Sequence, residues 1–192
     1  MINTDVISVT TPLDRGILHR LKAGDRVTLS GEVLVFRDEV HRILCEMIER
    51  GETLPFSLKD AALYYCGPTP GSRGMPVGSA GPTTSSRMDR FTGPLLEQGL
   101  AMTIGKGNRS PEVAALMVRH RAVYMAAIGG IGALLAKHIT FSKVIAFPQF
   151  GPEAARIFTV RDFPLITAID TEGRNKYEYT PQPLNLLKQQ CI

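Results

Sequence analysis

Cysteine is scarce in this chain of 192 residues, and neither sign of charge dominates it. The three cysteines, Cys45, Cys66 and Cys191, are too few and too scattered for a disulfide framework, which indicates reduced thiols in a cytosolic protein. Lys and Arg number 22 against 18 Asp and Glu, a net charge of +4, and the basic residues are spread along the chain. Nucleic-acid binders usually carry a denser basic stripe, so this charge favours a local anion site.

Long hydrophobic runs and targeting signals are also missing. The longest apolar run, residues 122–136, contains three glycines and is too short to span a membrane. The first residues lack the basic and then apolar regions of a signal peptide. No internal repeat, low-complexity tract or charged linker is found, and 44% hydrophobic with 21% charged residues is ordinary globular composition. We therefore expect a single cytoplasmic domain over residues 1–192, with no membrane or nucleic-acid partner.

Short strand patterns alternate with short helical patterns, which predicts an α/β fold. Residues 26–36 are dense in β-branched side chains, with a turn or bulge at Ser30–Gly31. Helical spacing follows, with Asp38 as the predicted N-cap, Gly51 at the end, and His41 on the polar side, where a surface position is expected. The remaining patterns predict strands at 61–66, 100–104, 122–128, 143–147 and 163–170, a helix that starts at Ser110–Pro111, and a short helix at 153–158.

A segment rich in glycine and proline interrupts this alternation. Nine of the sixteen residues 67–82 are Gly or Pro, and so long a loop is either a surface excursion or functional. Thr83 or Thr84 can cap a short helix directly after it, which would place Thr83 and Arg87 on the same side of the first turn. Hydroxyls, free backbone amides and a guanidinium would then converge on one spot, which suits a carboxylate. The alternative is simple helix capping with a solvated arginine.

Two more basic residues occupy positions typical of anion sites. Lys106 stands between two glycines after a predicted strand, so its backbone can lie close to whatever the ammonium contacts. Arg37 falls between a predicted strand and a helix N-terminus, where sites in α/β sheets concentrate. The glycine spacing around Lys106 does not match a Walker loop, and residues 129–134 do not match a dinucleotide-binding fingerprint.

No evident base, metal site or cofactor site accompanies these groups in the sequence. The four histidines are widely separated, none pairs with a cysteine as metal ligands, and no nucleophile elbow is found. The cysteine spacing does not resemble iron–sulfur ligand runs, so no metal ligand is assigned to this chain. Taken alone, the chain looks like half of an active site.

Five segments together resemble the β subunit of class I, iron–sulfur fumarate hydratases. The same family includes the L-tartrate dehydratase β subunit and the C-terminal domain of single-chain iron–sulfur fumarases. The resemblance covers about residues 13–183, and GPTT-x-x-RMD ahead of IGKG is its most specific pattern. The segments are YYCGPTP (64–70), GPTTSSRMD (81–89), IGKGN (104–108), AVYMAAIGGIGALLAKHI (122–139) and FPLITAIDTEG (163–173).

The resemblance implies a three-layer β/β/α swivelling domain that docks onto a larger α subunit in a hetero-oligomer. The partner's cysteines would carry a [4Fe–4S] cluster with one open iron, and this chain would bind no cluster alone. The implied activity is that of a hydro-lyase acting on a C4 dicarboxylate, hydrating fumarate to malate or dehydrating tartrate. By motif, Thr83, Arg87 and Lys106 take catalytic positions, with Thr83 transferring a proton. Arg37 and Thr84 join these three in binding the substrate.

Alternatives remain open at this point. The residues do not separate fumarate and malate from tartrate and oxaloacetate, because one extra hydroxyl is read by few contacts. A second class of function is a non-catalytic module that holds a dicarboxylate or an organic phosphate in the same anion pocket. A phosphohistidine swivelling domain would need a histidine in a mobile exposed loop, and residues 67–82 contain none.

Overall fold

A computed structural model describes residues 5–72 and 74–178. In this part of the chain, seven strands form one mixed sheet in the order β1-β2-β3-β6-β7-β9-β8. Neighbouring strands from β1 to β7 in this order run parallel, whereas β9 is antiparallel to each strand that it pairs with. The bounds are β1 Val6–Thr10, β2 Arg26–Val35, β3 Ala62–Tyr64, β6 Met102–Gly105, β7 Val123–Ala126, β8 Ile139–Ala146 and β9 Ala155–Ile169.

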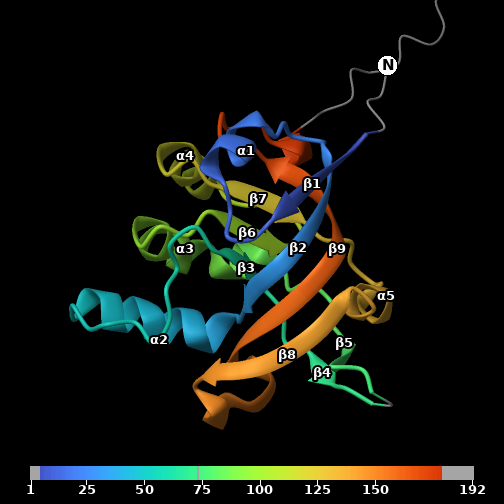
Figure 1. The fold of residues 1–192 in the computed structure, drawn as a ribbon. Helices are drawn as coiled ribbons and strands as arrows, with labels where there is room; N and C mark the ends of the chain where they lie inside the picture. Colours follow the sequence, from blue (N-terminus) through green and yellow to red (C-terminus); the bar gives the residue numbers. More distant parts are fainter. Residues whose placement is uncertain (1–4, 73, 179–192) are drawn as a thin grey trace, which may run out of the picture.

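Helices connect the parallel strands, and a small hairpin stands apart from the main sheet (Figure 1). The hairpin pairs β4 with β5 and lies in the segment rich in glycine and proline. The bounds are α1 Arg15–Arg20, α2 Asp38–Glu49, β4 Thr69–Pro70, β5 Val77–Ser79, η1 Ser85–Met88, α3 Asp89–Glu97, α4 Pro111–Arg119, α5 Gly132–Ala136, η2 Pro148–Glu153 and η3 Lys176–Glu178. Within residues 5–72 and 74–178, none of the helices combines the length and the apolar character of a membrane span.

Strand β9 closes the sheet into a ring. Its 15 residues pair with β8, with β2 over most of the length of β2, and with β7 near its own C-terminal end. Because β2 also pairs with β3, the strands β2, β3, β6, β7 and β9 form a closed circuit. The bulge expected at Ser30–Gly31 is present as a register shift between Leu29 and Gly31 in the β2–β9 ladder.

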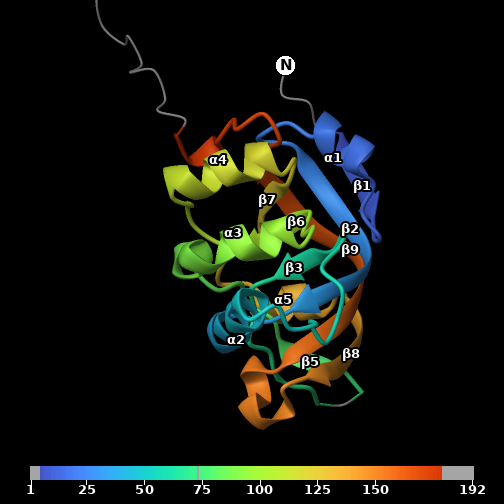
Figure 2. The same ribbon diagram turned by 90° about the vertical axis from the view of Figure 1, so that its left-hand side faces the viewer.

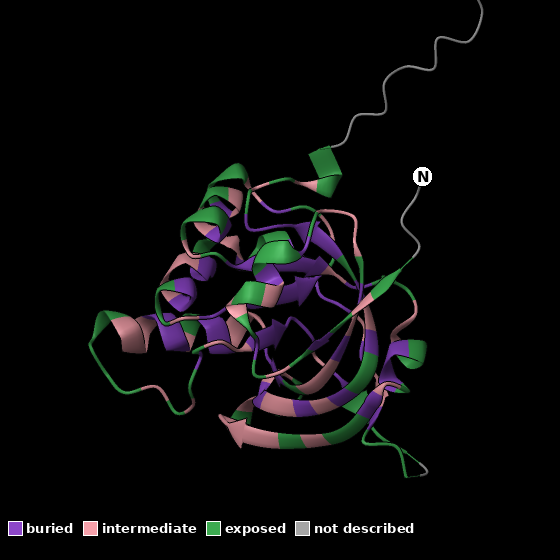
Figure 3. Ribbon diagram, turned by 45° about the horizontal axis from the view of Figure 1, so that its top comes forward, coloured by how far each residue is buried: buried purple, intermediate pink, exposed green. Residues whose placement is uncertain are grey.

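The hydrophobic residues fall into two clusters, one on each side of the parallel strands. Side chains of β2, β3, β6, β7 and β9 fill the inside of the ring, among them Val33, Tyr64 and Phe158. Leu63 and Tyr65, one residue out of phase with Tyr64, pack against helices α2, α3 and α4 instead. Helices α2, α3 and α4, the parallel strands β3, β6 and β7, and the β1-β2-β9-β8 strands thus form successive layers (Figure 2), and the strands of the middle layer are buried (Figure 3). The predicted α/β class is confirmed.

The short helix predicted at residues 153–158 is wrong. Strand β9 begins at Ala155, and only the preceding 3-10 turn, η2, is helical. Phe158 faces the inside of the ring, whereas Ile157 packs on the helical side, which is the period-two alternation of a strand. The two strands predicted at 143–147 and 163–170 are correspondingly parts of the longer β8 and β9.

Helix α4 begins as predicted, because the Ser110 hydroxyl accepts a hydrogen bond from the Val113 amide at 3.3 Å. The predicted cap of α2 is different. Arg37 is the N-cap, its side chain makes no capping hydrogen bond, and Asp38 is the first helical residue. The reason is that both carboxylate oxygens of Asp38 lie against arginines rather than against the first helical amides.

Candidate functional site

All five residues singled out in the sequence line one cavity of about 420 Å³. The cavity lies beyond the carboxyl ends of β3 and β6, where the chain leaves the sheet at Cys66 and Lys106. It is bordered on the other side by the start of α5. Its lining residues are Arg37, Gly67, Ser79, Gly81, Pro82, Thr83, Thr84, Arg87, Lys106, Gly130 and Gly132.

Backbone hydrogen bonds fix the two threonines between strand ends. The Thr83 amide donates to the Tyr65 carbonyl at 2.7 Å, and the Lys106 amide donates to the Thr83 carbonyl at 3.1 Å. The Ser85 amide then donates to the Lys106 carbonyl at 2.8 Å. Residues 83–85 therefore act as a short strand extension inserted between the ends of β3 and β6, which places Thr83 and Lys106 side by side.

The expected helix N-terminus has a different form. The turn that follows, η1, is a 3-10 helix that starts at Ser85, with Thr84 as an N-cap whose side chain makes no capping hydrogen bond. Thr83 precedes the helix altogether, so it does not share a first turn with Arg87. Both side chains reach the cavity because Thr83 is held by the strand ends while Arg87 extends from the turn.

The glycine before Lys106 permits this close approach. A Cβ atom on Gly105 would lie 2.1 Å from the Ser85 hydroxyl oxygen and 3.2 Å from the Thr83 carbonyl oxygen. Gly107, after the lysine, has a φ of +77°, a conformation that residues with a side chain rarely adopt. The two glycines of the GKG pattern are thus required for different reasons. A side chain at Gly105 would clash with its neighbours, and the backbone conformation of Gly107 disfavours any side chain.

Arg37 and Arg87 come from different segments and share one carboxylate. Oδ1 of Asp38 lies 2.9 Å from Nη2 of Arg87, and Oδ2 lies 3.3 Å from Nε of Arg37. Nη2 of Arg37 also donates to Oε1 of Glu153, in the turn before β9. The sequence reasoning named both arginines but missed Asp38 as their partner and missed Glu153 entirely. The position of Asp38 directly after Arg37 was the available signal, whereas Glu153 is distant in sequence.

Lys106 differs from the two arginines. Its side chain is exposed, and it forms no ion pair with any residue in the described ranges. Half of the Arg87 side chain is exposed, whereas Thr83 is buried, with only 8% of its surface exposed. Three cationic side chains and two partner carboxylates therefore surround the cavity, which leaves a net positive charge facing it. That balance favours an anionic ligand.

His41 is not on the surface, contrary to the prediction from its helix. It is fully buried beneath the start of α2, with its ring against Phe36, Tyr65 and Phe91. Its Nδ1 lies 2.8 Å from the Arg37 carbonyl oxygen. Burial lowers the pKa of His41 to about 4, opposed by the hydrogen bond to the Arg37 carbonyl. The neutral imidazole therefore supports the backbone of Arg37. Helical spacing misassigned it because Phe91 of α3 and Tyr65, the residue after β3, cover this face too.

The described residues do not fit an iron–sulfur cluster. Among them, no group of three or more His, Cys, Asp or Glu side chains could hold a metal ion. Cys45 and Cys66 are free and buried, and burial raises their pKa values to about 11 and about 12, so both stay protonated thiols. Cys191 lies outside the described residues.

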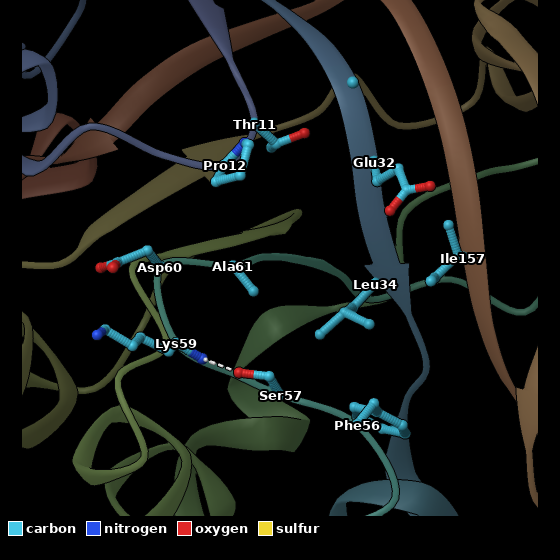
Figure 4. Close-up of a pocket in the computed structure, with 11 residues that line it drawn as sticks. Thr11, Pro12, Glu32, Leu34, Phe56, Ser57, Lys59, Asp60, Ala61 and Ile157 are labelled. Carbon is cyan, nitrogen blue, oxygen red and sulfur yellow. Dashed lines mark hydrogen bonds between the residues drawn. The ribbon is translucent and has the colours of Figure 1, made fainter.

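A second cavity, of about 450 Å³, lies between β2 and the segment before β3 (Figure 4). Leu34, Phe56 and Ile157 give it an apolar wall, and Lys59 and Glu32 lie on opposite sides. None of the five predicted residues contributes to it. The cavity around Lys106 is therefore the candidate site.

Comparison with known proteins identifies the family. The chain matches the family "Fumarase C-terminus" over residues 2–180. It is 37% identical to Fumarate hydratase 2 of Leishmania major over 178 residues, covering 91% of this chain and 31% of that protein. It is 31% identical to the L(+)-tartrate dehydratase subunit beta of Escherichia coli (strain K12) over 172 residues, covering 87% of this chain and 84% of the relative.

The coverage differs between these relatives. The chain spans about a third of the length of the fumarate hydratases it matches, such as the anaerobic class I fumarate hydratase of Escherichia coli, where the share is 31% at 35% identity. It spans most of the tartrate dehydratase β subunit. The match over nearly the whole described chain, together with the cavity formed by its GPTT and GKG segments, shows that this chain belongs to the fumarase C-terminus family.

Proposed function

We propose that the chain is one domain, residues 1–192, and serves as the β subunit of an iron–sulfur hydro-lyase. In this proposal it completes the active site of a larger α subunit and reversibly hydrates fumarate to malate, or dehydrates tartrate. The observation that carries the proposal is the convergence of Thr83, Arg87, Lys106 and Arg37 on one cavity with a net positive charge.

The cationic groups suit the two carboxylates of a C4 dicarboxylate. Arg87 uses Nε and Nη2 on Asp38, which leaves Nη1 for a ligand. Lys106 supplies an ammonium that forms no ion pair within residues 5–72 and 74–178, next to the hydroxyl-bearing Thr83 and Thr84. A carboxylate bound between Lys106 and Arg87 would be held by charge-assisted hydrogen bonds, which are about twice as strong as neutral ones. The same groups would stabilise the extra negative charge that develops on this carboxylate as the adjacent carbon loses its proton.

Thr83 is proposed to transfer that proton. Its backbone is held on both sides by the strand ends, so its hydroxyl has a fixed place on the cavity wall. A hydroxyl is a weak base at neutral pH, and its pKa must be lowered for this role. The nearby positive charge of Lys106 acts in that direction.

The cluster is assigned to the partner. Because the described residues offer no ligand set, we propose that the α subunit carries a [4Fe–4S] cluster and that this chain supplies only binding, orientation and proton transfer. The assembly would be a cytoplasmic hetero-oligomer. A tartrate dehydratase subunit beta among the relatives supports a separate partner chain.

The test is anaerobic co-purification of this chain with its α subunit, followed by assays of fumarate hydration and tartrate dehydration. Activity of the complex, with a colourless and inactive isolated chain, is the expected result. A matched complex with Lys106→Ala should lose activity while still assembling. An iron–sulfur absorption band in the isolated chain would overturn the cofactor assignment. Tight binding of a dicarboxylate or phosphate, without turnover in the complex, would favour the non-catalytic module instead.

A further inference from the structure

A buried ion pair lies directly behind the candidate site. The side chain of Arg109 is fully buried, and its Nε donates to Oδ1 of Asp89 at 2.6 Å. The other two nitrogens of the guanidinium donate as well, to the hydroxyls of Thr92, Thr103 and Tyr65. Oδ2 of Asp89 accepts the Ser110 amide at 2.8 Å. The pair therefore connects the start of α3 with the start of α4.

Tyr124 extends this network to the two segments that supply Thr84 and Lys106 to the cavity. The Arg109 guanidinium lies 5.3 Å from the centre of its ring. The Tyr124 hydroxyl donates to the Gly107 carbonyl at 2.7 Å and accepts from the Ser85 hydroxyl at 2.9 Å. Burial raises the pKa of this phenol, so the hydroxyl keeps the proton that it donates. One phenol thus joins the residue after Lys106 to the residue after Thr84.

Fold stability alone does not require these groups. Replacing a buried ion pair by apolar side chains of similar volume is often neutral or stabilising. The network instead joins two segments that each carry residues of the candidate site. Ser85 and Asp89 flank Arg87, whereas Gly107 and Arg109 follow Lys106. A rigid connection between these segments fixes the separation of Arg87 and Lys106.

We propose that Tyr124 and Arg109 are positioning residues that hold Arg87 and Lys106 at the spacing a dicarboxylate requires. The inference rests on the proposed function for the identity of the ligand. It adds that the spacing is set from behind the cavity, through side chains that touch no substrate.

Two backbone amides report directly on this alignment. The Ser85 amide donates a hydrogen bond to the Lys106 carbonyl, and the Lys106 amide donates one to the Thr83 carbonyl. Tyr124→Phe removes a single hydroxyl and is the mildest variant. Arg109→Lys keeps the charge but loses the planar fork. Arg15→Lys is the matched control, since Arg15 likewise binds one carboxylate, that of Asp60, and the carbonyls of Gly99, His120 and Arg121 at the amino ends of the strands.

In the isolated chain, Tyr124→Phe and Arg109→Lys should speed hydrogen exchange at the Ser85 and Lys106 amides by about tenfold or more. In the complex, kcat/KM for the dicarboxylate should fall by about tenfold or more, because small misplacements of binding groups are costly. Arg15→Lys should change neither, because the contacts of Arg15 lie at the opposite ends of the strands.

Exchange at these two amides that matches the Arg15→Lys control would overturn the inference. So would faster exchange with an unchanged kcat/KM. If the wild-type complex catalyses no hydration or dehydration, the proposed function fails, and the positioning role is then decided by exchange together with calorimetric affinity for malate. In that case, faster hydrogen exchange at the two amides with an unaltered affinity for malate would also overturn the positioning role.

Discussion

The carboxylate of Asp38 holds the guanidinium of Arg87 through two donors, with Oδ1 at 2.9 Å from Nη2 and 3.1 Å from Nε. Asp38 is the first residue of α2 and Arg87 belongs to η1, so the contact crosses between two segments. The arrangement fixes the plane of the guanidinium while its remaining amino group stays available to a ligand.

Arg87→Lys is expected to lower kcat/KM of the complex by more than about thirtyfold, because a lysine lacks the planar fork that binds Asp38 through two nitrogens and keeps the third for a substrate carboxylate. Removing one partner of a buried, hydrogen-bonded charge pair costs about 2–5 kcal/mol. Stability should change by only about 0.5 kcal/mol, since the side chain is half exposed. Steady-state kinetics beside urea unfolding would check both. A lysine variant that assembles and keeps most of its activity would mean that Arg87 is an ordinary surface residue.

Gly105→Ala is expected to destabilise the chain by about 1–3 kcal/mol, because the new methyl group would meet the Ser85 hydroxyl and the Thr83 carbonyl. Gly93→Ala is the matched control within α3, where a Cβ atom would make only an ordinary contact with Leu116 at 3.5 Å. That change should stabilise by about 0.5–1 kcal/mol through helix propensity. Thermal or urea unfolding of the two variants should give shifts of opposite sign, and equal shifts would contradict the packing argument.

Stability should fall as the pH drops from about 6.5 to about 4, in part because of His41. Its pKa is lowered to about 4 by burial, so the unfolded chain binds this proton first. The contribution is fully present above pH 6.5 and is lost towards pH 4. A pKa difference of two to three units corresponds to about 3 kcal/mol. His41→Asn cannot titrate, so its free energy of unfolding should depend less steeply on pH in this window. Parallel curves for both proteins would show that His41 does not titrate in this way.

Binding of the α subunit is expected to slow hydrogen exchange in the segment from Gly67 to Pro82. The base of this segment is already fixed, since the Tyr64 hydroxyl donates to the Ala80 carbonyl and the Ala80 amide donates to the Gly132 carbonyl. The described residues between 69 and 76 are all exposed and can order at an interface. Protection should therefore increase at the tip and not at Val77 to Ala80. Equal protection at the tip in the free chain and in the complex would argue against a contact there.

The sequence carried enough information to predict the alternation of strands and helices and the position of the anion-binding groups, because both depend on local patterns. GPTT and GKG follow strand ends, and parallel strands bring their carboxyl ends to one edge. It could not predict the partners of those groups. Asp38 looked like a helix cap, and Glu153 reaches Arg37 from more than a hundred residues away. His41 was misassigned for the same reason, since its cover comes from Phe91 and Tyr65 in other segments.

The ring closed by β9 determines when, during synthesis, the chain can complete its fold. Arg26 pairs with Ile166 and Val35 pairs with Arg156, so the circuit of strands closes only after nearly all described residues have been synthesised. Pairings this distant in sequence form slowly, because the loop-closure entropy is lost before the contacts compensate for it. Until then β2 presents an unpaired edge, and nascent chains are exposed to non-native strand pairing. A ribosome that pauses before residue 155 would therefore hold a chain whose anion-binding segments have been synthesised but whose ring of strands is still open.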